Sequence, residues 1–152
     1  MRLLSRNADY AVNALCYMSR ISEDRIVSVT ELVRHLKMPR PFLRKILQVL
    51  NNRGILRSHR GAGGGFRLAR KPRDIYLIDI MEAFQGTVRL NECLFRKNVC
   101  PNIKTCFLKK KLSGIEKRVL VELGAITIDS IIKPFGKSSG FYPERRRGIK
   151  GE

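Results

Sequence analysis

Apolar residues recur at spacings of three and four along the first third of the chain and predict three amphipathic helices. The first covers residues 7–20 and buries Ala8, Ala11, Val12, Leu15 and Met18. The second follows Ser28-Val29-Thr30-Glu31, which matches the S-x-x-E capping box of a helix start. The third starts at Pro41 and buries Leu43, Ile46, Leu47 and Leu50. Two short helices joined by a tight turn predict a helix-turn-helix.

The pattern then changes to two short β-strands, residues 55–59 and 66–70, around the glycine-rich tip RGAGGG. The tip lacks the Lys-Ser/Thr of a P-loop and the G-x-G-x-x-G of a dinucleotide fold, which argues against a nucleotide site. A hairpin after the third helix predicts a β-wing. The expected fold is therefore mainly α with a small β-wing, a winged helix-turn-helix DNA-binding domain followed by a long C-terminal dimerisation helix.

A helix over residues 78–85 leads into a segment that contains three of the four cysteines. Beyond it, one apolar seam comprises Leu108, Leu112, Ile115, Val119, Leu123 and Ile126. The seam predicts a homodimer, with packing on the chain's own core as the alternative. We divide the chain into a DNA-binding domain (1–86), a cysteine-containing loop (87–106), a dimerisation helix with a short terminal helix (107–133), and a disordered basic tail (134–152).

The charge narrows the choice of partner. The 152 residues carry a formal net charge of +18 with a pI near 10.5, which favours double-stranded DNA over a membrane surface. Neither a signal pattern nor a membrane span is recognisable, so we expect a cytoplasmic protein. The two histidines, His35 and His59, fall in the predicted DNA-binding domain, and no nucleophile–base pair or paired carboxylates suggest an enzyme or a small-molecule substrate. No aromatic-rich strand suggests RNA binding.

The DNA-contacting residues are expected on the third helix and the wing. Arg44 and Gln48 suit base edges, because Arg reads guanine and Gln can read adenine, whereas Arg40 and Lys45 suit phosphates. An ordinary solvated helix face is the alternative for this set. The wing would touch the backbone or minor groove through Arg57, His59, Arg60, Gly61, Gly63, Gly64, Gly65 and Arg67.

Cys93, Cys100 and Cys106 form a Cys-x6-Cys-x5-Cys array. Cytoplasmic thiols stay reduced, so clustered cysteines favour a metal site or a redox sensor over disulfides. Zinc sites usually draw on paired C-x2-4-C knuckles, which are absent here, yet zinc and a clusterless thiol switch remain open. Cys16 lies beside the apolar face of the first helix and is most simply a small buried hydrophobe.

Several stretches together resemble the Rrf2 family of bacterial regulators. They are MRLLSRNADYAV, PRPFLRKILQVLNNRGIL, SHRGAGGGFRLAR, IYLIDIMEAFQG and the three cysteines before a long helix. The resemblance covers residues 1–133 and is most specific where the wing is followed by the cysteine triplet. It points to the iron–sulfur branch, with IscR-, NsrR- and RirA-like members.

That resemblance implies a dimer that binds a 2Fe–2S or 4Fe–4S cluster through Cys93, Cys100 and Cys106. The first interval is one residue longer than the commonest spacing, which leaves the cluster type open. An IscR-like histidine ligand would fall at Lys109, which cannot ligate when protonated. Asp9, which matches the aspartate of NsrR-like members, would supply a fourth ligand from the partner subunit, with Cys16 of the partner and Glu92 as alternatives. A helix N-terminal acid is the ordinary explanation of Asp9.

The expected function is a sequence-specific DNA-binding transcriptional repressor. An iron–sulfur cluster that senses iron, redox state or nitric oxide would switch its DNA affinity. The alternative is a clusterless or zinc-containing transcription regulator, controlled by thiol redox chemistry or by a protein partner.

Overall fold

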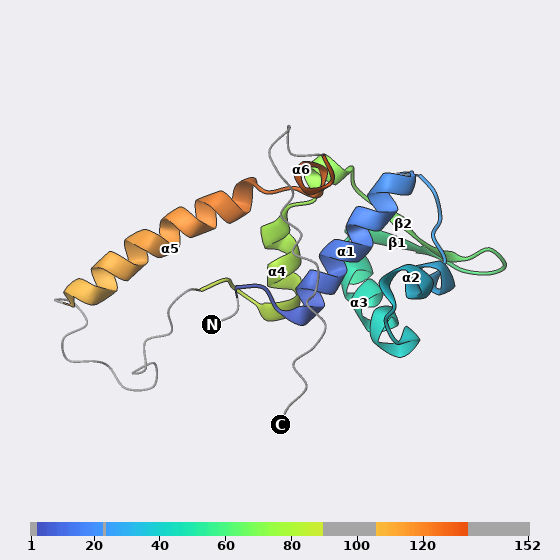
Figure 1. The fold of residues 1–152 in the computed structure, drawn as a ribbon, viewed down its shortest axis with the longest axis horizontal. Coiled ribbons are helices and arrows are strands. Elements are labelled where there is room, and N and C mark those ends of the chain that lie inside the picture. Colours follow the sequence, from blue (N-terminus) through green and yellow to red (C-terminus); the bar gives the residue numbers. More distant parts are fainter. Residues whose placement is uncertain (1–2, 23, 90–105, 134–152) are drawn as a thin grey trace, which may run out of the picture.

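The computed structural model describes residues 3–22, 24–89 and 106–133 (Figure 1). In chain order its elements are α1 (Arg6–Ile21), α2 (Val29–Leu36), α3 (Arg40–Asn52), β1 (Leu56–His59), β2 (Gly65–Leu68), the 3-10 helix η1 (Pro72–Asp74), α4 (Leu77–Gln85), α5 (Phe107–Ala125) and α6 (Ile128–Ile132). The prediction of a mainly helical fold with a two-stranded wing is confirmed. The predicted tail (134–152) lies outside the described residues.

The helix starts follow the local sequence, with two departures from expectation. Ser28 accepts a hydrogen bond from the Glu31 amide at 3.1 Å, but the Glu31 carboxylate pairs with Arg25 at 3.0 Å instead of completing the expected capping box. A charge-assisted hydrogen bond from a guanidinium is stronger than one from a neutral backbone amide, which explains this difference. Helix α3 starts at Arg40, with Pro39 as its N-cap, one residue before the predicted start at Pro41. Pro41 is thus the second helical residue, where proline is tolerated because the backbone amide of that position has no acceptor within the helix.

The main hydrophobic core joins the first three helices to the wing and to α6. Leu15 of α1, Leu47 of α3 and Ile128 of α6 are fully buried in it. Helix α6 packs against α1 and η1, so the last helix of the described chain shares a core with the first. Burial of this apolar surface is the main source of stability for the DNA-binding module.

The wing is an antiparallel hairpin with one extra attachment to the helices. Leu56 pairs with Leu68 and both are buried. Val27 forms an isolated bridge to Phe66, with reciprocal backbone hydrogen bonds of 2.8 and 2.9 Å. This bridge connects the loop before α2 to the returning strand and so fixes the wing beside the helix-turn-helix.

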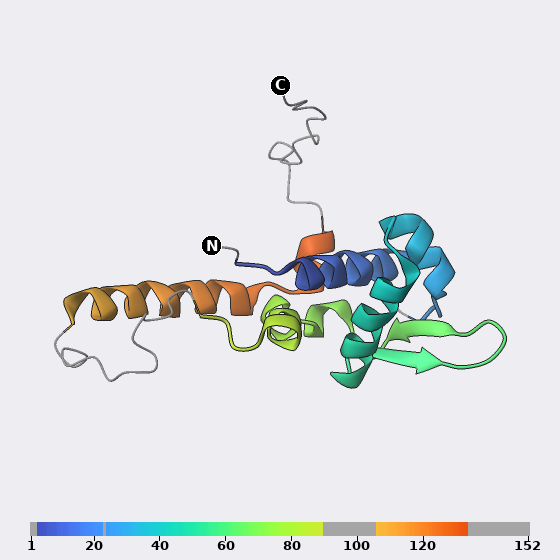
Figure 2. The same cartoon turned by 90° about the horizontal axis from the view of Figure 1, so that it is seen from below.

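Helix α5 leaves this module and extends away from it, opposite the wing (Figures 1 and 2). Its C-terminal part contacts a small second core of Met81, Val88 and Leu123. A bridge between Tyr76 and Thr127 joins the α5–α6 junction to the start of α4. The rest of α5 presents apolar side chains to solvent, including Phe107 at 83%, Leu108 at 67% and Val121 at 72% exposed. Among the described residues, no helix combines the length and apolarity that crossing a membrane requires.

Candidate nucleic-acid interface

A groove of about 490 Å³ lies between α3, the start of α2 and the wing. It brings together seven of the predicted DNA-contacting residues: Arg40, Arg44, Gln48, His59, Gly61, Gly64 and Gly65. Sequence reasoning did not select the other five lining residues for DNA contact: Ser28, Val29, Thr30, Ser58 and Phe66. The groove therefore combines positive charge with small hydroxyl side chains, a composition suited to a phosphodiester backbone beside base edges.

Arg44 and Gln48 lie on the exposed face of α3 because Leu43, Ile46 and Leu47 occupy its buried face. The two residues are four positions apart and so follow each other along one side of the helix. Lys45 is exposed but is not among the residues that line the groove. Its position suits a phosphate at the rim rather than a base.

The C-terminal turn of α3 carries two asparagines with distinct contacts. Asn51 Oδ1 accepts a hydrogen bond from the Ser58 amide at 2.9 Å, which ties α3 to β1. Asn52 Oδ1 accepts one from Gln48 Nε2, also at 2.9 Å. The partner of Asn51 is set by how the wing meets the helix, whereas Asn52 bonds to a residue one turn earlier on its own helix.

Arg57 and Arg67 are directly opposite each other across the hairpin. Like charges in such a pair repel and destabilise a sheet unless an anion lies near them. Neither side chain has an ion-pair partner among the described residues. Together with the exposed Arg60 at the tip, they give the wing a positively charged surface suited to phosphates.

The wing glycines serve two purposes. A Cβ on Gly64 would lie 2.6 Å from the His59 carbonyl oxygen, and one on Gly65 would lie 2.3 Å from that of Val27. These two positions are therefore required by the chain's own backbone. Gly61 and Gly63 adopt φ of 93° and 75°, and a Cβ there would meet nothing within 4 Å. They form an open turn that a partner can approach.

His59 lines the groove with an unpaired ring nitrogen. Its Nε2 atom is buried and has no hydrogen-bond partner among the described residues. A buried polar atom without a partner costs about 1–3 kcal/mol. His59 thus lines the groove with a ring nitrogen whose hydrogen-bonding capacity is unused, and its contact with DNA stays a prediction.

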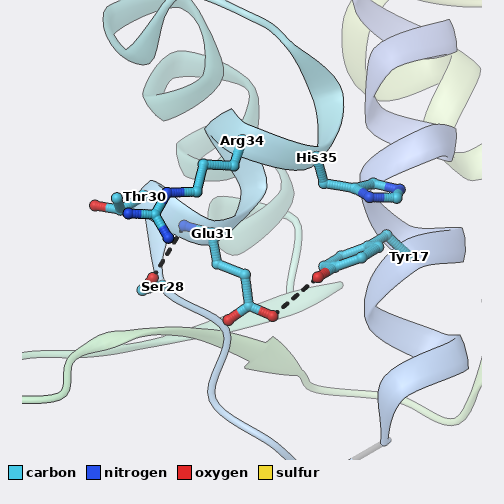
Figure 3. A pocket seen from close by; sticks show the side chains of 6 residues that line it. All are labelled: Tyr17, Ser28, Thr30, Glu31, Arg34 and His35. Carbon is cyan, nitrogen blue, oxygen red and sulfur yellow. Dashed lines mark hydrogen bonds between the residues drawn. The ribbon is translucent and has the colours of Figure 1, made fainter.

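A second pocket adjoins the groove and shares Ser28 and Thr30 with it. As Figure 3 shows, Tyr17 of α1 reaches Glu31 of α2 with its hydroxyl, at 3.0 Å, below the ring of His35. The Tyr17 and His35 rings stack at 3.9 Å between centroids. The hydrogen bond to Glu31 raises the pKa of Tyr17 above its ordinary value. These contacts hold α2 against α1 and so help place α2 at the groove.

Cys106 is the one member of the predicted cysteine triplet within the described residues. It is the N-cap of α5, half-buried, and its Sγ accepts a hydrogen bond from the Lys109 amide at 3.4 Å. The partial positive charge of a helix start favours a negatively charged group there, and a metal-bound thiolate is such a group. Cys93, Cys100 and Glu92 lie outside the described residues.

The two other ligand candidates differ in exposure. Asp9 is exposed in the first turn of α1, where Asn13 Nδ2 donates to its Oδ1 at 3.4 Å. Cys16 is half-buried against the main core, and burial raises the pKa of its thiol. Within residues 3–22, 24–89 and 106–133, no three Cys, His, Asp or Glu side chains come together as a possible metal site. The predicted set of ligands is thus not assembled by the described part of one chain.

Comparisons with known proteins agree with this architecture. The model of the Rrf2 family, described as iron-dependent transcriptional regulators, matches residues 4–134. A predicted HTH-type transcriptional regulator of Aquifex aeolicus is 32% identical over 132 residues, which cover 86% of this chain and 91% of that protein. Protein aau3 of Rhizobium meliloti is 30% identical over 131 residues, covering 86% of this chain and 84% of that protein.

Solved structures share the fold. The B. subtilis global cysteine regulator CymR superposes with a TM-score of 0.72 at 20% identity, over 87% of this chain and 97% of that one. The T. potens IscR structure gives a TM-score of 0.64 at 25% identity, over 85% of each chain. Since the family model spans nearly all the described residues and the groove joins α3 to the wing, this chain belongs to the Rrf2 family and is a DNA-binding transcriptional regulator.

Proposed function

We propose that the protein is a dimeric repressor whose affinity for its operator is controlled by an iron–sulfur cluster. The observation that carries this proposal is the position of Cys106, the last cysteine of the triplet, as the N-cap of α5. The opposite end of α5 is joined to the DNA-binding module through Tyr76 and Thr127. A group bound at Cys106 therefore sits at one end of a helix whose other end reaches that module.

The donor chemistry suits such a cluster. Cys93, Cys100 and Cys106 would supply three thiolates, and Asp9 of the partner subunit the fourth ligand. Asp9 fits better than Cys16, because its carboxylate is exposed whereas burial keeps the Cys16 thiol protonated to higher pH. When bound, the cluster would supply a centre whose charge and ligation change with iron supply, oxidation or nitric oxide. The family description as iron-dependent and the likeness to T. potens IscR support this assignment.

The exposed face of α5 supports a dimer. Phe107 and Val121 lie fourteen positions apart on one side of the helix, and both are more than two-thirds exposed. Leu108 and Ile115 extend the apolar surface on the adjoining side. An isolated helix with so much apolar surface is stabilised by packing against another, and the α5 of a second copy offers a matching surface.

On DNA, the two α3 helices of the dimer would enter successive major grooves. Arg44 and Gln48 would contact base edges, and Arg40 and Lys45 phosphates. The Arg57–Arg67 pair would meet the backbone beside the wing. Cluster binding would couple to DNA binding through two arrangements of α5 and the α3 helices. A coupling free energy of about 1–3 kcal/mol would change DNA affinity about 5- to 150-fold.

Purification without oxygen tests the cluster. The expected product is brown, absorbs visible light and contains iron and acid-labile sulfide. Cys106→Ala should abolish this absorption and alter DNA affinity, whereas Asp9→Ala should shorten the lifetime of the cluster in air. Cys16→Ala is the matched control and should change neither property. A colourless or zinc-containing wild-type protein would contradict the proposal.

The same preparation distinguishes the alternative functions. A clusterless thiol switch would yield a colourless protein whose DNA affinity changes on oxidation and recovers with a reductant. A regulator controlled by a protein partner would respond to neither treatment. These outcomes leave the DNA-binding role intact and replace only the signal.

A further inference from the structure

The hairpin of the wing is attached to the rest of the domain along both of its edges at the same level. On the outer edge of β2, Phe66 and Val27 exchange backbone hydrogen bonds of 2.8 and 2.9 Å. On the outer edge of β1, the Ser58 amide donates to Asn51 Oδ1 of α3 at 2.9 Å. Ser58 and Phe66 are register partners, so the two attachments lie at one level of the hairpin.

The backbone geometry explains why α3 supplies a side chain at this point. Because Val27 engages both backbone groups of Phe66, Ser58 and Phe66 form a non-hydrogen-bonded pair of the antiparallel ladder, and the Ser58 amide points away from β2. Among the described residues that edge of β1 has no strand neighbour, so Asn51 supplies the acceptor that a third strand would otherwise provide.

The direction of this hydrogen bond is fixed by the backbone. Ser58 offers a main-chain N–H group, which cannot act as an acceptor and cannot turn independently of the strand. Turning the Asn51 amide by half a turn would therefore place its Nδ2 against a second donor and break the contact. The attachment needs an oxygen of the residue 51 side chain at this place.

The Ser58 contact is the outermost hydrogen bond on the β1 edge. The next one toward the base joins the Ile55 amide to the Leu50 carbonyl of α3 at 2.9 Å. Between residues 59 and 64, no hydrogen bond among the described residues joins the wing to a helix, and the tip extends past the helices (Figure 2). On this edge, Asn51 therefore sets the angle of the tip to α3.

Arg60 lies in this tip and Arg44 on α3, and both side chains are exposed. Two contacts with one ligand reinforce each other only when both groups are held at the spacing of their targets. We infer that Asn51 is a positioning residue for DNA binding: its hydrogen bond to β1 holds the wing tip at the angle to α3 at which Arg60 and Arg44 reach one duplex together. The inference rests on the proposed DNA contacts and adds the residue that sets their relative position.

The test measures the slope of log affinity against log salt for the full-length protein on one duplex, selected by the wild type from a randomised library. In the wild-type background, Arg60→Gln should lower the slope by about 0.9 per protomer, the value for one phosphate. In the Asn51→Ala background the same substitution should lower it by less than about half as much, because the tip no longer brings Arg60 to the duplex. Base preference at the positions that Arg44→Ala affects should be the same in Asn51→Ala and the wild type, because the buried face of α3 stays in the core.

Two further variants separate positioning from a general loss of stability. Asn51→Asp keeps an acceptor for the Ser58 amide, so the full effect of Arg60→Gln should return, although the added negative charge weakens binding. Asn52→Ala is the matched control, because the Asn52 side chain bonds to Gln48 of its own helix. In that background, Arg60→Gln should have its wild-type effect.

Hydrogen exchange in the wild type tests the contact without any substitution. The Ser58 amide should exchange more slowly than the Gly63 amide, which has no hydrogen-bond partner among the described residues. Equal exchange rates would overturn the positioning role, as would equal effects of Arg60→Gln in the wild-type and Asn51→Ala backgrounds. If Arg60→Gln leaves the wild-type slope unchanged, the proposed wing contact itself is absent and the inference fails with it.

Discussion

At the scale of single residues, the wing depends on glycines whose neighbours are backbone atoms. Gly65 passes so close to Val27 that a Cβ would lie 2.3 Å from its carbonyl oxygen. Backbone of the Val27–Phe66 bridge cannot move aside without losing its two hydrogen bonds. The base of the wing therefore tolerates only glycine at this position.

Gly65→Ala should destabilise the protein by about 1–3 kcal/mol, the usual cost of forcing an extra carbon into a packed site. Thermal unfolding would show this as a lower melting temperature, and DNA affinity should fall with it. Gly124→Ala is the control, since a Cβ there meets nothing within 4 Å on α5. Equal melting temperatures for the two variants would contradict the close approach.

Cys16 makes stability depend on pH in the alkaline range. Burial raises the pKa of its thiol above the ordinary value of 9.0, so the folded protein holds the proton more tightly than the unfolded chain. The associated stability is fully present below pH 9.0 and is lost as pH rises through the folded-state pKa. Melting temperatures measured from neutral to alkaline pH should fall less steeply for Cys16→Ala than for the wild type. Parallel curves would show that the thiol does not contribute.

At the scale of elements, the sequence predicts the helices whose apolar residues recur at regular spacing. Helix α1 extends one residue beyond each end of its predicted range, 7–20, and α3 starts one residue before its predicted start, because their buried faces recur with helical spacing. The bridges Val27–Phe66 and Tyr76–Thr127 were not predicted. Each pairs single residues from distant parts of the chain, and an isolated pair leaves no periodic pattern.

In the candidate site, too, residues on one helix face were predictable, whereas residues placed by packing between elements were not. Arg40, Arg44 and Gln48 could be chosen from the polar face of one helix. Ser28 and Thr30 were missed as groove residues, because their place in it depends on how α2 packs beside the wing. The S-x-x-E pattern predicted the helix start but not what that start would face.

Gln85 links α4 to the segment before α1. Its Oε1 accepts from the Ser5 amide at 2.9 Å and its Nε2 donates to the Leu3 carbonyl at 3.0 Å. Gln85→Ala should cost about 1–3 kcal/mol for the two hydrogen bonds, less if water replaces them, and should speed hydrogen exchange at the Ser5 amide. Glu82→Ala, one turn earlier on α4, should leave that exchange rate unchanged. Slow exchange in Gln85→Ala would contradict the link.

At the scale of the whole molecule, α5 and the wing lie at opposite ends (Figure 2). The two ends present different surfaces: α5 exposes large apolar side chains among its lysines, whereas the wing exposes arginines beside glycines. Assembly and DNA binding can therefore be weakened separately by substitution.

Ile115→Glu should shift the protein from dimer to monomer, because a charge would enter the proposed helix–helix contact. Sedimentation velocity over a range of protein concentrations would measure this shift. Ser113→Glu, on the side of α5 away from Ile115 and Phe107, should leave the dimer in place. A monomeric wild type, or two variants with the same association constant, would argue against α5 as the dimer surface.

The formal net charge of +18 predicts DNA binding that weakens steeply as salt rises. If Arg57 neutralises one phosphate, Arg57→Gln should reduce the slope of log affinity against log salt by about 0.9 per protomer. Lys117→Gln should leave the slope unchanged, because Lys117 lies on α5, far from the wing. An unchanged slope in Arg57→Gln would remove the wing pair from the DNA contacts.

Helix α6 gives the chain the topology of a domain with an insertion. The helix that precedes the insertion, α4, and the one that follows it, α6, both pack on α1. Helix α5 therefore lies between two helices that are both anchored to the DNA-binding module, rather than trailing from the end of that module. An insertion with two anchors can turn a change in its own shape into strain on its host, whereas an appendage with one anchor cannot. Removing the chain after Gly86 would take α6 from the core and leave a reading head that lacks Ile128.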